Sequence, residues 1–172
     1  GIQVEGSSEV KKIVFGVSVS QKLFQYAIEN HAQMIIVHHG LFWRGGPKPF
    51  HLTGIMKQRV KQLLDHDINL LGYHLPLDAH PEVGNNAMLL KKMNLPATEP
   101  FEVGFFSQLE QGITPEELQH RLDSCLPDPS TMFGDSMGLI KRIAVVSGGA
   151  AGLLEKAWIQ GADALITGEA SE

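Results

Sequence analysis

The chain has 172 residues, of which 43% are hydrophobic and 19% charged, a balance typical of a folded domain with a packed core and not of a disordered chain. A net charge of −5 and the absence of a basic cluster argue against a nucleic-acid-binding surface. Cys125 is the single cysteine, which excludes an intramolecular disulfide and disfavours a cysteine-ligated zinc site.

Two further features concern the cell compartment. No apolar run approaches the roughly 18 residues that a membrane helix needs, and no signal-peptide pattern opens the sequence. A lone thiol is compatible with a reducing environment. We therefore expect a cytoplasmic protein that does not enter a membrane.

The first chemically informative segment is the apolar run at residues 34–37, which His38, His39 and Gly40 follow. Consecutive apolar residues, mostly β-branched, predict a buried strand of a parallel sheet. Ligand sites in open α/β sheets lie just beyond the carboxyl ends of the strands. The two imidazoles therefore stand where a site is expected.

Neighbouring side chains on a regular strand point to opposite faces, which limits how His38 and His39 can act together. They converge on one ion if the strand ends there, which Gly40 permits. Otherwise they can serve two metals a few ångströms apart, bridged by a carboxylate such as Asp78, as in two-metal hydrolases. The plainest alternative makes one histidine a hydrogen-bonded core residue and leaves the other facing solvent.

Trp43 and Arg44 come soon after the histidine pair and are candidate substrate-binding residues. An indole ring can stack on a nucleobase, and a guanidinium group can grip a phosphate. The same two residues can equally be a packing residue and a solvated charge. Both interpretations stay open at this point.

A second strand is predicted at residues 68–73, after a helix at about residues 52–65, and His74 stands at its end. Asp78 follows shortly, and together the two strand ends supply a set of ligands that suits a divalent transition metal. We assign His74 either to support of the ligands or to general-base chemistry. His80 and Glu82 are weaker candidates, because His80 precedes a proline and Glu82 can simply begin the helix predicted at residues 83–93.

Residues 96–141 differ in character from the flanking segments. Thr114, Pro115 and Glu117 form a strong helix start, with a capping hydroxyl, proline at the first position and glutamate three residues after the cap. The helix should end near Leu122, before a turn at residues 127–130. We find no chemistry in this stretch and interpret it as an insert or an inter-lobe element.

Residues 143–167 repeat the pattern of residues 13–37 without a gap, at an offset of 130 positions. Each copy predicts a strand, a small-residue turn, an amphipathic helix and a second strand, with Ser20 as the helix cap in the first copy. We interpret the pair as a duplicated βαβ unit, and chance similarity between two such units is the alternative. The apolar helix stripes predicted in the two copies are Leu23, Phe24, Ala27 and Ile28, and Leu153, Leu154, Ala157 and Trp158.

The alignment also suggests chemistry in the second copy. Gly168 and Glu169 occupy the positions of His38 and His39, so Glu169 is a candidate ligand or general base. If the two copies face each other, the site lies between them. The glycine-rich segment at residues 147–152 precedes a predicted helix and could hold an anion, although it matches neither the Rossmann nor the Walker spacing and close packing explains its glycines as well.

The expected organisation is α/β, with two related lobes. Residues 1–95 form the first lobe, residues 96–141 the insert or linker, and residues 142–172 the start of a second lobe. The sequence does not begin with methionine, and the second copy ends before the equivalent of the first copy's next helix and strand. We therefore expect a fragment with an incomplete second lobe.

Four segments resemble the Nif-three-like family, also catalogued as type 2 GTP cyclohydrolase I: residues 1–6, the strand ending in His38, His39 and Gly40, residues 77–86 and residues 163–169. The resemblance implies a toroidal homohexamer with a dinuclear metal centre between two related lobes of each subunit. By matching positions, His38, His39 and Asp78 would be metal ligands. The family's other two ligands, a histidine and a glutamate, belong to a C-terminal motif that these residues do not contain.

The same resemblance implies two divalent cations per subunit, with zinc, iron, manganese and nickel all compatible with such ligands. It also implies a metal-dependent hydrolase acting on a nucleotide or a similar small molecule. In a cyclohydrolase the attacked atom would be C8 of guanine, and His74 or Glu169 would be the nearest general base. The competing hypothesis is a metal-binding oligomeric scaffold or regulatory protein without turnover.

Overall fold

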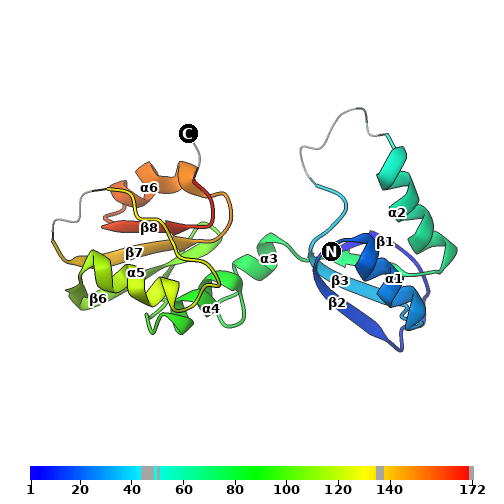
Figure 1. Cartoon of the computed structure of the whole chain (residues 1–172), viewed down its shortest axis with the longest axis horizontal. Helices are drawn as coiled ribbons and strands as arrows, with labels where there is room; N and C mark the ends of the chain where they lie inside the picture. The colour runs from blue at the N-terminus through cyan, green and yellow to red at the C-terminus, as the bar shows by residue number, and fades with distance from the viewer. Residues whose placement is uncertain (44–48, 50, 135–137, 171–172) are drawn as a thin grey trace. The chain divides into compact units, whose positions relative to one another are not determined.

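A computed structural model describes residues 1–43, 49, 51–134 and 138–170. It divides into two compact units, Gly1–His74 and Leu75–Glu172, and each contains a four-stranded mixed sheet with helices (Figure 1). This arrangement confirms the predicted α/β class. None of the helices in the described ranges combines the length and the apolar character that crossing a bilayer demands.

The first unit is a sheet with strand order β1-β4-β3-β2, in which β2, β3 and β4 run parallel and β1 is antiparallel to β4. Its helices connect the parallel strands, as expected for βαβ units. The bounds are β1 Ile2–Val4, β2 Ile13–Ser18, α1 Gln21–Glu29, β3 Met34–His39, α2 Gly54–Asp65 and β4 Asn69–Gly72.

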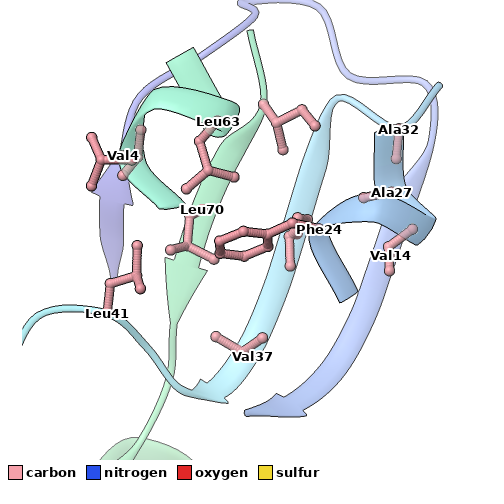
Figure 2. Close-up of a cluster of buried hydrophobic side chains, with 12 residues drawn as sticks. Val4, Val14, Phe24, Ala27, Ala32, Val37, Leu41, Leu63 and Leu70 are labelled. Atoms are coloured by element: carbon pink, nitrogen blue, oxygen red, sulfur yellow. The ribbon is translucent and has the colours of Figure 1, made fainter. Parts of the chain in front are cut away.

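The core of the first unit lies between one face of this sheet and the two helices (Figure 2). Phe24 of α1 and Leu63 of α2 pack there with Leu70 of β4, and all three are almost completely buried. Burial of each such side chain contributes roughly 1.5–3 kcal/mol. The predicted cap of α1 is confirmed, because the hydroxyl of Ser20 accepts a hydrogen bond from the Leu23 N–H at 3.1 Å.

The second unit has strand order β5-β6-β7-β8, with β5, β6 and β7 antiparallel and β8 parallel to β7. Thr114 caps α5 by accepting a hydrogen bond from the Glu117 N–H at 3.2 Å, which confirms that predicted helix start. The bounds are α3 Leu75–Asp78, α4 Asn85–Lys92, β5 Glu99–Phe101, β6 Gly104–Ile113, α5 Pro115–Asp123, β7 Ile140–Val146, the 3₁₀ turn η1 Ala151–Leu153, α6 Leu154–Ile159 and β8 Ala164–Thr167.

The compact units divide the chain at a different place from the lobes expected at residues 1–95, 96–141 and 142–172. Helix α4 belongs to the second unit, where the fully buried Leu90 packs with Phe105 and Ile143. The segment at residues 96–141 supplies β5 and β6, two strands of the second sheet. The residues assigned to an insert thus pair directly with the strands of the second βαβ copy.

The two βαβ copies share one strand register, which confirms their predicted alignment. The paired residues in each sheet differ by the same offset of 130 positions that relates the sequences. They are Ile13↔Met34, Val14↔Ile35, Phe15↔Ile36 and Gly16↔Val37 in the first copy, and Ile143↔Ala164, Ala144↔Leu165, Val145↔Ile166 and Val146↔Thr167 in the second.

The apolar stripe predicted for the second helix is partly wrong. Ala157 is buried, but Leu154 is 61% and Trp158 72% exposed. In the first copy α2 lies beside α1 and helps to bury Phe24, the counterpart of Leu154. Helix α6 instead begins after a 3₁₀ turn and packs on β8. The sequence pattern therefore identified an apolar stripe that the structure buries only in part.

Candidate metal centre

Three histidines gather where β3 and β4 end. The parallel register places Val37 opposite Gly72, so the residues that follow these two positions emerge at the same edge of the sheet. His38 and His39 end β3, and His74 comes two residues after β4. One ligand atom from each of the three imidazoles lies within 4.8 Å of the others. That spacing allows all three side chains to reach one metal ion.

The rings of His38 and His39 converge although their residues are consecutive on a strand. Their centroids are 4.3 Å apart, and the centroid of His74 lies 4.8 Å from that of His38 and 5.4 Å from that of His39. All three imidazoles are half-buried. Of the arrangements that the sequence left open, convergence at the end of a strand agrees with this geometry.

Gln3 of β1 fixes the turn that follows the histidine pair. Its side-chain oxygen accepts hydrogen bonds from the N–H groups of Leu41 at 2.7 Å and Phe42 at 3.2 Å, and its amide nitrogen donates to the Phe42 carbonyl at 3.0 Å. A Cβ atom on Gly40 would lie 2.3 Å from the same Gln3 oxygen. Gly40 is therefore needed for this close approach, which directs the chain away from the strand just after His39.

Two side chains border the cluster. The hydroxyl of Ser18 lies 2.8 Å from Nδ1 of His39, across the β2–β3 pairing. The indole of Trp43 lies edge-on to His74, with centroids 4.8 Å apart and an interplanar angle of 84°, and its centroid is 5.9 Å from that of His39. Trp43 is 49% exposed, so part of the indole faces solvent beside the histidines. Arg44 lies outside the described residues.

Asp78 belongs to the second compact unit, whereas the three histidines belong to the first. Asp78 ends α3 and is buried, and its Oδ1 accepts a hydrogen bond from the side chain of Asn85 at 2.7 Å. The neighbouring Asn86 also holds this region, by donating to the Asp78 carbonyl at 3.2 Å. The joint role of Asp78 and the histidines as ligands stays a prediction.

Of the two weaker candidates near Asp78, His80 has hydrogen-bond partners with a structural role. Nδ1 of His80 lies 3.2 Å from the Glu82 N–H nitrogen and 3.3 Å from that of Val83, and accepts from both. His80 thus closes the turn that leads into α4. Glu82 is exposed and precedes that helix, which begins at Asn85.

Glu169 follows β8 and is exposed. Two backbone N–H groups of the glycine-rich segment at residues 147–152 already have protein acceptors. The Ser147 N–H donates to the side chain of Asn86 at 2.6 Å, and the Ala150 N–H donates to the Thr167 hydroxyl at 3.0 Å. A Cβ atom on Gly149 would lie 3.2 Å from a carboxylate oxygen of Glu169. These contacts favour close packing over anion binding as the explanation of the glycines.

Reasoning from the sequence missed Ser18 and Gln3. Ser18 reaches His39 only through the parallel register of β2 and β3, and Gln3 reaches the turn from a strand 38 residues away in sequence. The sequence offers a faint signal for Ser18, since it ends the strand expected to lie beside the histidine strand. For Gln3 its only signal is that residues 1–6 are one of the segments that resemble the family, which does not point to the turn after His39.

Comparison with known proteins gives similarity over the whole chain. Residues 1–172 match the model of the family Duf34/NIF3 (NGG1p interacting factor 3). A protein of Haemophilus influenzae named GTP cyclohydrolase 1 type 2 homolog is 42% identical over 178 residues, which cover 100% of this chain and 70% of that protein. A protein of Pseudomonas aeruginosa with the same name is 41% identical over 179 residues, covering 100% and 69%.

Two solved structures resemble the chain closely. One, titled as protein ybgI of unknown function, is 39% identical with a TM-score of 0.87, and the match covers 100% of this chain and 70% of that one. The other, TTHA1606 from Thermus thermophilus, is 34% identical with a TM-score of 0.82, covering 100% and 69%.

Proposed function

The chain belongs to the Duf34/NIF3 family, and from this membership and its histidine cluster we propose that it is a metal-dependent hydrolase acting on a nucleotide or a related small molecule. The convergence of His38, His39 and His74 carries the proposal. Neutral imidazoles are ligands for zinc, iron, manganese and nickel, so the donor set fits a divalent transition metal. The name shared by the curated relatives directs the choice of substrate class toward nucleotides.

In this proposal His38 and His39 hold the cation. A bound divalent cation supplies Lewis acidity, which lowers the pKa of water and polarises the group that is attacked. The finer features implied by the family resemblance are also proposals. They comprise a second cation, Asp78 as a further ligand, and assembly into a homohexameric ring.

We assign proton transfer to His74. Its ring is 4.8 Å from that of His38 and 4.8 Å from that of Trp43, so it contacts both the proposed ligands and the half-exposed indole. A general base must lie within hydrogen-bond reach of the proton that it moves. A substrate stacked on Trp43 would bring its reacting group toward His74. Glu169 is the second candidate base from the sequence, and its part in the reaction stays a prediction.

Trp43 is the proposed platform for a planar base. Its indole is 49% exposed and borders the histidines, and stacking of a base on an aromatic side chain contributes about 1–3 kcal/mol. Trp43→Phe should preserve most of this stacking, whereas Trp43→Leu should raise KM for a nucleotide by about tenfold or more, the equivalent of about 1.4 kcal/mol. Arg44 remains a candidate for a phosphate contact on sequence grounds.

The test begins with elemental analysis of protein purified without added metal, followed by turnover assays with GTP and a panel of other nucleotides. The proposal expects bound metal and chelator-sensitive hydrolysis. His38→Ala and His39→Ala should lose both, whereas His74→Ala should keep the metal and lose turnover. Loss of metal from His74→Ala would make His74 a ligand and end its assignment as the base.

Turnover, read together with the oligomeric state measured by light scattering, distinguishes the hydrolase from the scaffold or regulator. A protein that binds metal and forms its ring but hydrolyses nothing across the panel would be a scaffold or regulator, and the hydrolase proposal would be wrong. A protein that binds no divalent metal under any of these conditions would refute the metal site as well.

A further inference from the structure

We infer that Ser18 is a positioning residue for His39, which it orients so that the imidazole binds metal through Nε2. This inference rests on the proposed metal site and names a residue that neither the sequence motifs nor the family resemblance identified. The observation behind it is the 2.8 Å contact between the Ser18 hydroxyl and Nδ1 of His39.

The β2–β3 register produces this contact. Ser18 and His39 are partners in the parallel pairing, so their side chains project from the same face of the sheet. The backbone holds His39 at the same place, because its carbonyl accepts a hydrogen bond from the Val19 N–H at 3.0 Å. His39 is thus fixed at its main chain and at one ring nitrogen by two consecutive residues at the end of β2.

The contact selects which nitrogen of His39 is the ligand. A neutral imidazole carries its proton on one ring nitrogen and has a lone pair on the other. If the Nδ1–H donates to the Ser18 oxygen, the lone pair lies on Nε2, the nitrogen that a metal would then bind. Histidine ligands commonly donate their other N–H to an oxygen atom in this way, which fixes the tautomer and the plane of the ring.

The second βαβ copy supports a role linked to the histidine. At the offset of 130 positions, Gly148 stands in place of Ser18 and Glu169 in place of His39. In the second copy, β8 is followed by no imidazole at the position of His39, and its partner β7 is followed by no hydroxyl at the position of Ser18. The pairing in the second copy ends at Val146↔Thr167, before the position that corresponds to Ser18↔His39 in the first copy.

A matched pair of variants isolates the hydroxyl. Ser18→Thr and Ser18→Val introduce β-branched side chains of the same shape, suited to a strand, which differ by a hydroxyl against a methyl group. Ser20→Ala is the control for general destabilisation, since it removes the cap of α1, two residues away, and leaves the contact with His39 in place.

The experiment measures Zn²⁺ affinity of the whole chain by competition with a chromogenic chelator. The inference expects Ser18→Thr to bind as the parent does and Ser18→Val to bind about tenfold more weakly, at the lower end of the usual range because the contact is exposed. Ser20→Ala should bind normally. Equal Zn²⁺ affinity in the Thr and Val variants, with loss of binding in His39→Ala, would overturn the role of Ser18 while leaving the proposed metal site intact.

NMR of the histidine nitrogens gives a signal that would not change if Ser18 had only a structural role. Two-bond ¹H–¹⁵N correlation spectra of the Zn²⁺-loaded parent should show His39 bound through Nε2 with a proton on Nδ1. The Nδ1–H signal should shift or exchange faster in Ser18→Val and stay in Ser18→Thr. Binding of Zn²⁺ through Nδ1 of His39 would contradict the inference, and a parent that binds no Zn²⁺ would refute the proposed metal site together with it.

Discussion

The two βαβ copies close their helix-to-strand connections with the same hydrogen bonds. After the helix, the Ala32 N–H donates to the Ala27 carbonyl at 2.9 Å, and the Ala162 N–H donates to the Ala157 carbonyl at 3.0 Å. Ala27 and Ala157 are both buried, where a larger side chain would separate helix and sheet. The backbone of the two copies is therefore equivalent at this connection.

Each copy also has a side chain that accepts two backbone hydrogen bonds, but the residue type differs between the copies. Gln33 accepts hydrogen bonds from the N–H groups of residues 11 and 12, each at 3.0 Å. Asp163, its counterpart, accepts from those of residues 141 and 142 at 2.8 and 2.9 Å. An amide oxygen in the first copy and a carboxylate oxygen in the second thus accept equivalent hydrogen bonds, which fix the start of the neighbouring strand.

The copies differ at the ends of their second strands. The first ends in His38 and His39, whereas the second continues into Gly168 and Glu169. A Cβ atom on Gly168 would lie 2.9 Å from the Gly148 nitrogen, so this backbone cannot carry an imidazole there without moving. The comparison teaches that two copies can keep the same strand pairing while the second strand ends in a histidine cluster in one copy and in close backbone packing in the other.

Core packing should show the largest difference between the copies. Phe24→Ala removes a fully buried ring and should lower the free energy of unfolding of the first unit by about 3–5 kcal/mol. Its counterpart Leu154 is 61% exposed, so Leu154→Ala should change stability by less than about 0.5 kcal/mol. Trp43 and Trp158 lie in different units, and Trp158→Phe leaves Trp43 as a fluorescent reporter of the first.

Denaturant unfolding in that single-tryptophan background gives the measurement for Phe24→Ala. Leu154→Ala is measured in the converse background, Trp43→Phe, where Trp158 reports on the second unit. Similar losses for the two variants would mean that Leu154 is covered in solution, and the contrast between the helices would then fail.

Metal affinity should show the next largest difference. His39→Ala should weaken Zn²⁺ binding by at least about 100-fold, the equivalent of about 2.8 kcal/mol, because it removes a proposed ligand. Glu169→Ala removes the side chain at the matching position and should leave Zn²⁺ affinity unchanged. Isothermal titration of both variants tests the assignment. A comparable loss from Glu169→Ala would bring the second copy into the metal site.

Much of this organisation could be predicted from local sequence. The strand ending in two histidines and the capping hydroxyls of Ser20 and Thr114 depend on residues close together in the chain. The alignment of the two copies compares two such local patterns at an offset of 130 positions. Apolar runs, caps and glycine positions are short-range signals with direct structural meaning.

The remaining features depend on non-local contacts. The turn after His39 is set by Gln3 from the far edge strand, and the orientation of the His39 ring by Ser18 across a parallel register that no turn fixes. The prediction that Leu154 and Trp158 are buried was wrong. An apolar stripe shows which face of a helix can pack, but it does not show whether a neighbouring helix or strand is present to bury that face. Sequence patterns thus predicted that His38, His39 and His74 lie at neighbouring strand ends, but not the residues that support them.

Truncation of the paired acceptors should have a smaller effect. Asp163→Ala and Gln33→Ala each remove the acceptor for two backbone N–H groups. We expect a loss of about 1–2 kcal/mol for Asp163→Ala and about 1 kcal/mol for Gln33→Ala, since bonds to a charged oxygen are stronger. Unfolding of each unit, followed through its own tryptophan, checks the order. The interchange variants Gln33→Asp and Asp163→Gln should both fold, and failure of either would show that the two acceptors are not equivalent.

The smallest expected effect concerns how the two helices begin. Ser20 accepts the Leu23 N–H and α1 starts directly at Gln21, whereas Ala150, its counterpart, offers no side-chain acceptor and a 3₁₀ turn follows. Ser20→Ala should therefore lower the stability of the first unit by about 1 kcal/mol, and Ser20→Asp should restore it because a carboxylate also caps well. Trp43 fluorescence in the Trp158→Phe background measures both variants. If Ser20→Ala unfolds at the parent's denaturant concentration, the cap does not explain why the first helix is regular from its first residue, and the cause must lie in the packing of α1 against α2.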